Sequence, residues 1–145
     1  GTGLIGLKLK NPDNTFYGVD LSKAMLQKAN QKNVYKVLEQ ADAVAYLQQH
    51  KNEFSAIVAA DVFCYFGNLE KLLKEAAPTK IIFSIESDLQ TENYKIQPNG
   101  RYKHNLLYVE NILKSVGYTN IKSYPLVLRK ENNKNVDGLI FTAAV

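Results

Sequence analysis

The chain has 145 residues, of which 46% are hydrophobic and 22% are charged. This composition indicates one folded domain and excludes a disordered segment, and the length leaves no room for two ordinary domains. The formal charge of +4 comes from basic residues scattered singly along the chain, a distribution that does not favour nucleic-acid binding.

Helices and strands alternate in the first half of the chain. Strands are indicated by runs of β-branched and aromatic residues, and Ser22 is placed to cap a helix that turns Met25 inward. The elements we expect are a helix over 4–10, a strand over 15–19, a helix beginning at Ser22, a strand over 35–38 and a helix beginning at Asp42.

Helices and strands continue to alternate in the second half of the chain, until two strands follow each other at its end. In residues 86–101 the hydrophobic residues follow neither a helical nor a strand periodicity. This stretch also contains Pro98 and Gly100, so we expect a long loop there. The other expected elements are a strand over 54–60 buried on both faces, a helix over 69–76, a strand over 80–85, a helix that includes His104 at its start and ends at Gly117, and strands over 121–128 and 139–145.

Only the last two strands lack a helix between them, so they should form an antiparallel hairpin joined by the polar residues 129–137. The pattern therefore predicts an α/β fold in which a mostly parallel sheet carries this C-terminal hairpin.

Two neighbouring features suggest a nucleotide-like ligand. Gly1, Gly3 and Gly6 match the pattern GxGxxG, in which glycines let the backbone approach a ligand. Asp20 follows the next predicted strand, where a carboxylate accepts hydrogen bonds from ribose hydroxyls, although it can also cap a helix. An NAD-dependent oxidoreductase fits these features equally well, and so does a cofactor-binding module without turnover.

The residues around Asp20 weigh against the oxidoreductase. Residues 18–26 read GVDLSKAML, with Ala29 following, and they resemble the second cofactor segment of class I S-adenosylmethionine-dependent methyltransferases. Gly1-Thr2-Gly3 is similar to the end of that family's first segment. The resemblance implies a Rossmann-like three-layer sandwich, a methyl transfer reaction and S-adenosylmethionine as the cofactor.

The resemblance also implies roles for individual residues. The glycine loop would line the methionine part of the cofactor, Asp20 the ribose and Asp42 the adenine, while Asp61 would lie beneath the methyl group. For Asp42 a helix cap is nearly as good an interpretation, and both roles can hold together. The residues expected to contact the cofactor are Gly1, Thr2, Gly3, Asp20, Leu21, Met25, Ala41, Asp42, Ala43 and Asp61.

The residues after Asp61 bear on the acceptor. Val62 to Tyr65 replace the D-P-P-Y signature of enzymes that methylate nucleic-acid amino groups, which disfavours a DNA base. The stretch 54–69, together with 101–104, resembles bacterial predicted methyltransferases that are sometimes fused to tetratricopeptide repeats. We therefore expect a small-molecule or protein acceptor.

Few residues offer acid-base chemistry. His104 is the candidate base because histidine titrates near neutral pH, although a packing role is favoured for it. Tyr65 is a second candidate, on a wall that Tyr94, Tyr102 and Tyr108 could share, and the stretch 86–101 should form a mobile lid. For Cys64, the single cysteine, we favour a buried apolar role over a nucleophilic one.

The remaining expectations concern assembly and environment. Class I methyltransferases have a strand before the glycine loop, and its absence predicts a fragment over 1–145 whose sheet closes up or is completed by strand exchange in a homodimer. One cysteine fits a reducing cytoplasm. No apolar run approaches the roughly 18 residues of a membrane span, and no metal cluster is expected.

Overall fold

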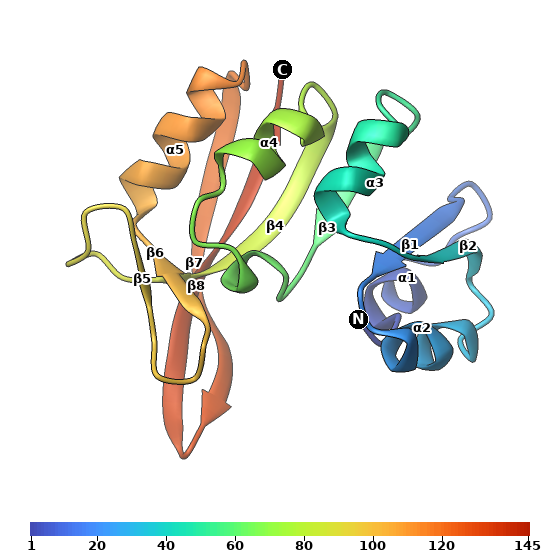
Figure 1. The fold of residues 1–145 in the computed structure, drawn as a ribbon, viewed down its shortest axis with the longest axis horizontal. Coiled ribbons are helices and arrows are strands. Elements are labelled where there is room, and N and C mark those ends of the chain that lie inside the picture. The colour runs from blue at the N-terminus through green and yellow to red at the C-terminus, as the bar shows by residue number, and fades with distance from the viewer. The chain divides into compact units, whose positions relative to one another are not determined.

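The computed structural model describes all 145 residues, which form two compact units, residues 1–50 and 51–145. Each unit has its own sheet (Figure 1). No helix has the length and apolar character that crossing a membrane requires.

The first unit, residues 1–50, packs helices against two parallel strands. Its elements are α1 (Leu4–Lys8), β1 (Phe16–Asp20), α2 (Lys23–Asn30), β2 (Tyr35–Gln40) and α3 (Ala43–Gln49). β1 and β2 run parallel, with Asp20 opposite Gln40, so both strands end at the same edge of this small sheet. Loops that follow the two strands must therefore lie near each other.

The second unit, residues 51–145, contains a larger mixed sheet and two helices. Its elements are β3 (Ala56–Ala59), the short 3-10 helix η1 (Phe63–Tyr65), α4 (Glu70–Ala76), β4 (Lys80–Ser87), β5 (Tyr94–Ile96), β6 (Tyr102–His104), α5 (Leu106–Ser115), β7 (Asn120–Glu131) and β8 (Lys134–Ala144).

Strand β4 is the centre of this sheet. β8 pairs antiparallel with it over residues 81–86, while β3 and β6 pair parallel with it over 80–83 and 86–87. β3 and β6 therefore share one edge of β4, and β8 and β7 continue the sheet from the other edge. A stack of Phe63 on Phe83 and Phe83 on Phe141, with ring centroids 4.2 and 5.2 Å apart, fills the core beneath β4.

The predicted order of elements over the first 85 residues is confirmed, with boundaries shifted by a few residues. Ser22 caps α2 by accepting from the Met25 amide at 3.4 Å, and Asp42 caps α3 by accepting from the Ala45 amide at 3.0 Å. The burial predicted for strand 54–60 is wrong, since Ala56 is exposed and Val58 is 40% exposed. β3 has β4 as its one partner strand and is an edge strand.

Two predictions in the second half are wrong. The stretch 86–101 is not one loop, because β4 continues to Ser87 and the three residues of β5 pair antiparallel with β6. His104 lies in β6 rather than in a helix, because Asn105 accepts from the Leu107 amide at 2.8 Å and so fixes the start of α5.

The C-terminal hairpin is confirmed, but its strands are longer than predicted. β7 and β8 pair as far as Glu131 and Lys134, so the linker expected over 129–137 is largely strand. Asn132 and Asn133 have φ of 49° and 59°, the left-handed conformation that a two-residue hairpin turn requires and that Asn tolerates.

Candidate functional site

The glycine loop and Asp20 lie together in the first unit. The Gly1 ammonium group pairs with Asp20 Oδ2, and the Ser22 amide donates to Asp20 Oδ1 at 2.7 Å. Burial raises the pKa of Asp20, but its hydrogen bonds outweigh burial and hold the pKa below its ordinary value. The carboxylate is therefore ionised at neutral pH and accepts hydrogen bonds.

Two of the loop glycines are required by close packing. Gly3 precedes α1 as its N-cap with φ of 81°, and a Cβ there would lie 2.8 Å from Ala29 Cα. A Cβ on Gly6 would lie 2.6 Å from the Tyr35 ring, whose hydroxyl accepts from the Gly6 amide at 3.1 Å. Gly1 differs, because nothing lies within 4 Å of the position its Cβ would take. The loop is thus closely packed at Gly3 and Gly6, whereas the space beside Gly1 is open.

Asp42 lies at the same edge of the β1–β2 sheet as Asp20, because the two strands are parallel. Its Oδ1 caps α3, and the side chain is exposed, which leaves Oδ2 available to a ligand. The Gln40 amide group donates to the Leu21 carbonyl at 2.9 Å and so ties the end of β2 to the loop after β1. The sequence-predicted residues of this unit therefore gather at one edge.

The other predicted residues of this edge vary in exposure. Leu21 is 68% exposed, so its side chain extends into solvent. The remaining four are half-buried: Thr2, Met25, Ala41 and Ala43.

The second unit presents Asp61 just after β3. Asp61 has φ of 59°, an uncommon conformation for a residue with a side chain, and its amide donates to the buried Ser84 hydroxyl at 3.0 Å. Its side chain is 60% exposed. The backbone thus holds a carboxylate at the surface beside β4.

Arg101 contacts both predicted residues of this unit that face solvent. Its Nη2 donates to Asp61 Oδ1, and its Nη1 donates to the Tyr65 hydroxyl at 3.0 Å. The guanidinium group also lies 5.1 Å from the centre of the Tyr65 ring, a cation–π geometry.

Glu86 lies beneath this surface, and only 2% of it is exposed. Its Oε1 accepts from Arg101 Nε at 2.5 Å and from Arg129 Nη2 at 2.9 Å, while Gln97 donates to Oε2 at 3.1 Å. Burial raises the pKa of Glu86, but the two arginines outweigh burial and hold the pKa below its ordinary value. Glu86 is therefore the buried charge on which both arginines are anchored.

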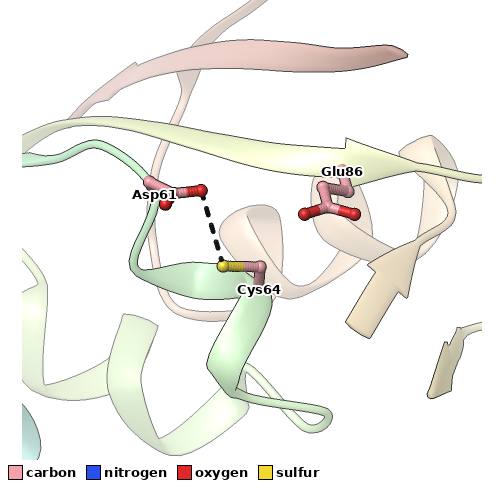
Figure 2. Close-up of side chains that lie close together, drawn as sticks. All are labelled: Asp61, Cys64 and Glu86. Atoms are coloured by element: carbon pink, nitrogen blue, oxygen red, sulfur yellow. Dashed lines mark hydrogen bonds between the residues drawn. The ribbon is translucent and has the colours of Figure 1, made fainter. Parts of the chain in front are cut away.

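Asp61, Cys64 and Glu86 have ligand atoms within 4.8 Å of one another, as a metal site would (Figure 2). The chemistry of this set does not fit a cation. Both carboxylates already bind guanidinium groups, and burial raises the pKa of Cys64 to about 12, so its sulfur stays a thiol. We interpret the group as an ion-pair network with a buried thiol beside it.

His104 is fully buried. Its Nε2 lies 2.8 Å from the Phe66 carbonyl oxygen and 3.0 Å from that of Gly67, so Nε2 carries the hydrogen and donates. Burial lowers the pKa of His104 and keeps the ring neutral. In this conformation the ring holds the 66–67 loop and exposes neither nitrogen, which favours the packing role over that of a base.

The predicted tyrosines fall into two groups. Tyr94, Tyr102 and Tyr108 surround His104 with ring centroids 5.7 to 6.5 Å apart, and a Cβ on Gly67 would lie 2.8 Å from Tyr94. Tyr65 is separate from them, 62% exposed and in contact with Arg101. The common wall of four tyrosines that the sequence suggested is thus divided.

Sequence reasoning missed the roles of Glu86, Arg101 and Arg129. One signal for Glu86 was present, because an acidic residue ends the apolar run of β4 and a buried charge needs a partner. The two arginines come from segments 28 residues apart in the chain, and no local pattern joins them.

A family model described as a methyltransferase domain matches residues 1–78. No curated protein matches the chain. S-adenosylmethionine is the cofactor of such methyltransferase domains.

Solved structures share the fold at low sequence identity. The magnesium protoporphyrin IX methyltransferase of Synechocystis PCC 6803 with bound S-adenosylmethionine has a TM-score of 0.70 and 16% identity, over 100% of this chain and 66% of that one. A possible histamine N-methyltransferase from Thermotoga maritima has a TM-score of 0.67 and 14% identity, over 99% and 77%. A putative S-adenosylmethionine-dependent methyltransferase from Listeria monocytogenes has a TM-score of 0.64 and 14% identity, over 99% and 97%.

These likenesses confirm the predicted fold class, a Rossmann-like α/β methyltransferase fold with a mixed sheet and a C-terminal antiparallel hairpin. The chain spans slightly less than two thirds of the cyanobacterial enzyme's length.

Proposed function

The chain belongs to the methyltransferase domain family, and from this premise we propose that it binds S-adenosylmethionine and transfers the methyl group to an acceptor. Bound S-adenosylmethionine supplies a methyl carbon that its positively charged sulfur has already activated. The residues of the chain then have to align the acceptor with that carbon and exclude water.

The observation that carries this proposal is that Asp20, held by the Ser22 amide, ends β1 in the same unit as the glycine loop before α1. A carboxylate there can accept hydrogen bonds from both ribose hydroxyls, and Asp42, at the neighbouring strand end, can accept from the adenine amino group through Oδ2. Gly1 is open to an approaching ligand. The other residues proposed to line the cofactor are Thr2, Gly3, Leu21, Met25, Ala41 and Ala43.

On the acceptor side we propose roles for Asp61, beneath the methyl group, and for Tyr65, both of which expose polar atoms. His104 is proposed to position the 66–67 loop, in keeping with its two carbonyl partners. The acceptor is proposed to be a small molecule or a protein, since neither the scattered basic residues nor the residues after Asp61 favour nucleic acid. We place the protein in the cytoplasm, where its single cysteine stays reduced.

Calorimetric titration of S-adenosylhomocysteine and NAD tests the cofactor. Asp20→Ala removes a charge-assisted hydrogen bond worth about 1.5–3 kcal/mol, so affinity for S-adenosylhomocysteine should fall roughly ten- to a hundred-fold. Asp13→Ala is the control, because Asp13 is exposed in the turn before β1 and should leave affinity unchanged.

The other outcomes are equally informative. Equal affinity in the wild type and Asp20→Ala would contradict the assignment of the ribose, and tighter binding of NAD would indicate an oxidoreductase. Transfer of a labelled methyl group to small amines, alcohols, carboxylic acids or peptides would separate an enzyme from a binding module.

A further inference from the structure

We propose that Tyr35 is a positioning residue for the cofactor, because it fixes the conformation of the glycine loop that lines the methionine part. The inference rests on the proposed function, in which Gly1 to Gly3 contact that part of the ligand. All the residues that carry the inference belong to the first unit, residues 1–50.

Tyr35 begins β2, and its ring packs against glycines from the glycine loop, α1 and β1. A Cβ added to Gly6 would lie 2.6 Å from Tyr35 Cζ. One on Gly18 would lie 3.1 Å from the ring atom Cδ1, and one on Gly3 would lie 3.2 Å from Cε2. A single ring therefore fills the space that three side chains would otherwise occupy, and it joins the glycine loop to both strands.

The Tyr35 hydroxyl supplies a cap that α1 lacks. α1 has five residues, and Gly3 at its N-cap has no side chain to accept from the amides of the first turn. The Leu7 amide donates to the Gly3 carbonyl at 3.2 Å, but the Gly6 amide precedes it and has no acceptor within the helix. The hydroxyl oxygen of Tyr35 accepts from that amide at 3.1 Å. The start of α1, and with it the loop, is therefore held from β2.

The ring and the hydroxyl act on different parts of the proposed site. The ring packs against Gly18, which precedes Asp20 in β1, so it also supports the strand that carries the ribose carboxylate. The hydroxyl binds the Gly6 amide, on the side of the glycine loop. Removing the hydroxyl while keeping the ring should therefore disturb the methionine end of the site and spare the adenosine end.

The test compares two ligands in Tyr35→Phe, which keeps the ring and removes the hydroxyl. S-adenosylhomocysteine carries the amino-acid chain, whereas methylthioadenosine keeps the adenosine and has a methyl group in place of that chain. By calorimetry, Tyr35→Phe should weaken binding of S-adenosylhomocysteine roughly fivefold, because the loop loses one neutral hydrogen bond. Its affinity for methylthioadenosine should change by less than about twofold.

Tyr124→Phe is the matched control, because Tyr124 is a 51% exposed tyrosine of β7 in the other unit, and it should leave both affinities unchanged. An unchanged ratio of the two affinities in Tyr35→Phe, whether both fall or neither does, overturns the inference alone. If neither ligand binds the wild type, the proposed function fails and the inference fails with it.

A second variant disturbs the same contact from the other side. In Gly6→Ala the added Cβ would lie 2.6 Å from the Tyr35 hydroxyl oxygen and would displace it from the Gly6 amide. Gly6→Ala should therefore also weaken S-adenosylhomocysteine more than methylthioadenosine. An unchanged ratio of affinities in this variant contradicts the role of Tyr35.

Amide hydrogen exchange without ligand tests the contact itself. Exchange at Gly6 should quicken roughly fivefold in Tyr35→Phe, because the amide loses its acceptor, while amides of β4 in the other unit keep their rates. Equal rates at Gly6 in the wild type and Tyr35→Phe would mean that the hydrogen bond is absent in solution, and the inference would be wrong.

Discussion

Asp20 ends one parallel strand and Asp61 follows another, yet the two carboxylates are held in different ways. Within the first unit, Asp20 is fixed by the amide of Ser22, two residues along the chain, and Asp42 caps the amide of Ala45, three residues along. Asp61 in the second unit is fixed by Arg101, 40 residues away, and Tyr65 is held by the same arginine over 36 residues.

One carboxylate is held by nearby backbone amides and the other by a distant side chain. The two sites should therefore differ in how many contacts a single substitution disrupts. A substitution that removes a helix cap disrupts only the first turn of that helix. The Arg101 contacts depend on a buried Glu86 that also binds Arg129, so a change at Glu86 releases several groups together. The second unit should therefore respond more strongly to single substitutions in its site.

The largest expected effect is that of Glu86→Gln. This change leaves two guanidinium groups without their buried countercharge, and we expect the free energy of unfolding to fall by about 3 kcal/mol. Urea unfolding at pH 7 measures it. Glu131→Gln is the control, because Glu131 pairs with the same Arg129 but is 44% exposed, and it should cost at most about 1 kcal/mol. Equal costs would show that burial of Glu86 is unimportant.

A pH series sharpens the same comparison. The pKa of Glu86 lies below its ordinary value of 4.5 in the folded protein, so its charge stabilises the fold fully above pH 4.5. This stabilisation is lost as the pH falls through the lowered pKa. The difference in unfolding free energy between wild type and Glu86→Gln should be constant from pH 7 to about pH 5.5 and shrink below 4.5. A difference that grows on acidification would contradict the ion pairs.

The contrast also explains what the sequence could predict. Ser22 and Asp42 were identified as caps because a cap and its helix are adjacent in the chain, and the order of elements followed from hydrophobic patterning. The predicted parallel arrangement holds for β1 and β2, and it brings Asp20 and Asp42 to one edge. The caps and the hydrophobic patterning depend on residues only a few positions apart.

The Arg101 network could not be predicted in this way. The strands β5 and β6 have three residues each, too few for a period, so the segment before His104 was interpreted as a loop. Unless the β5–β6 hairpin is recognised, the sequence does not indicate where the Arg101 side chain points or which residue pairs with Glu86. His104 was expected at a helix start because the cap, Asn105, is its neighbour and was not recognised.

The smallest expected effect is that of Ser22→Ala in the first unit. Loss of a side-chain cap costs about 1 kcal/mol, here through the Met25 amide. Because the cap is local, amide hydrogen exchange should quicken in α2 and its neighbours within residues 1–50, while amides in 51–145 keep their protection. Ser115→Ala, at the far end of α5, is the matched control and should change stability by no more than about 0.5 kcal/mol. If Ser22→Ala quickened exchange in both units equally, stability in residues 1–50 would not be local, and the contrast between Asp20 and Asp61 would lose its basis.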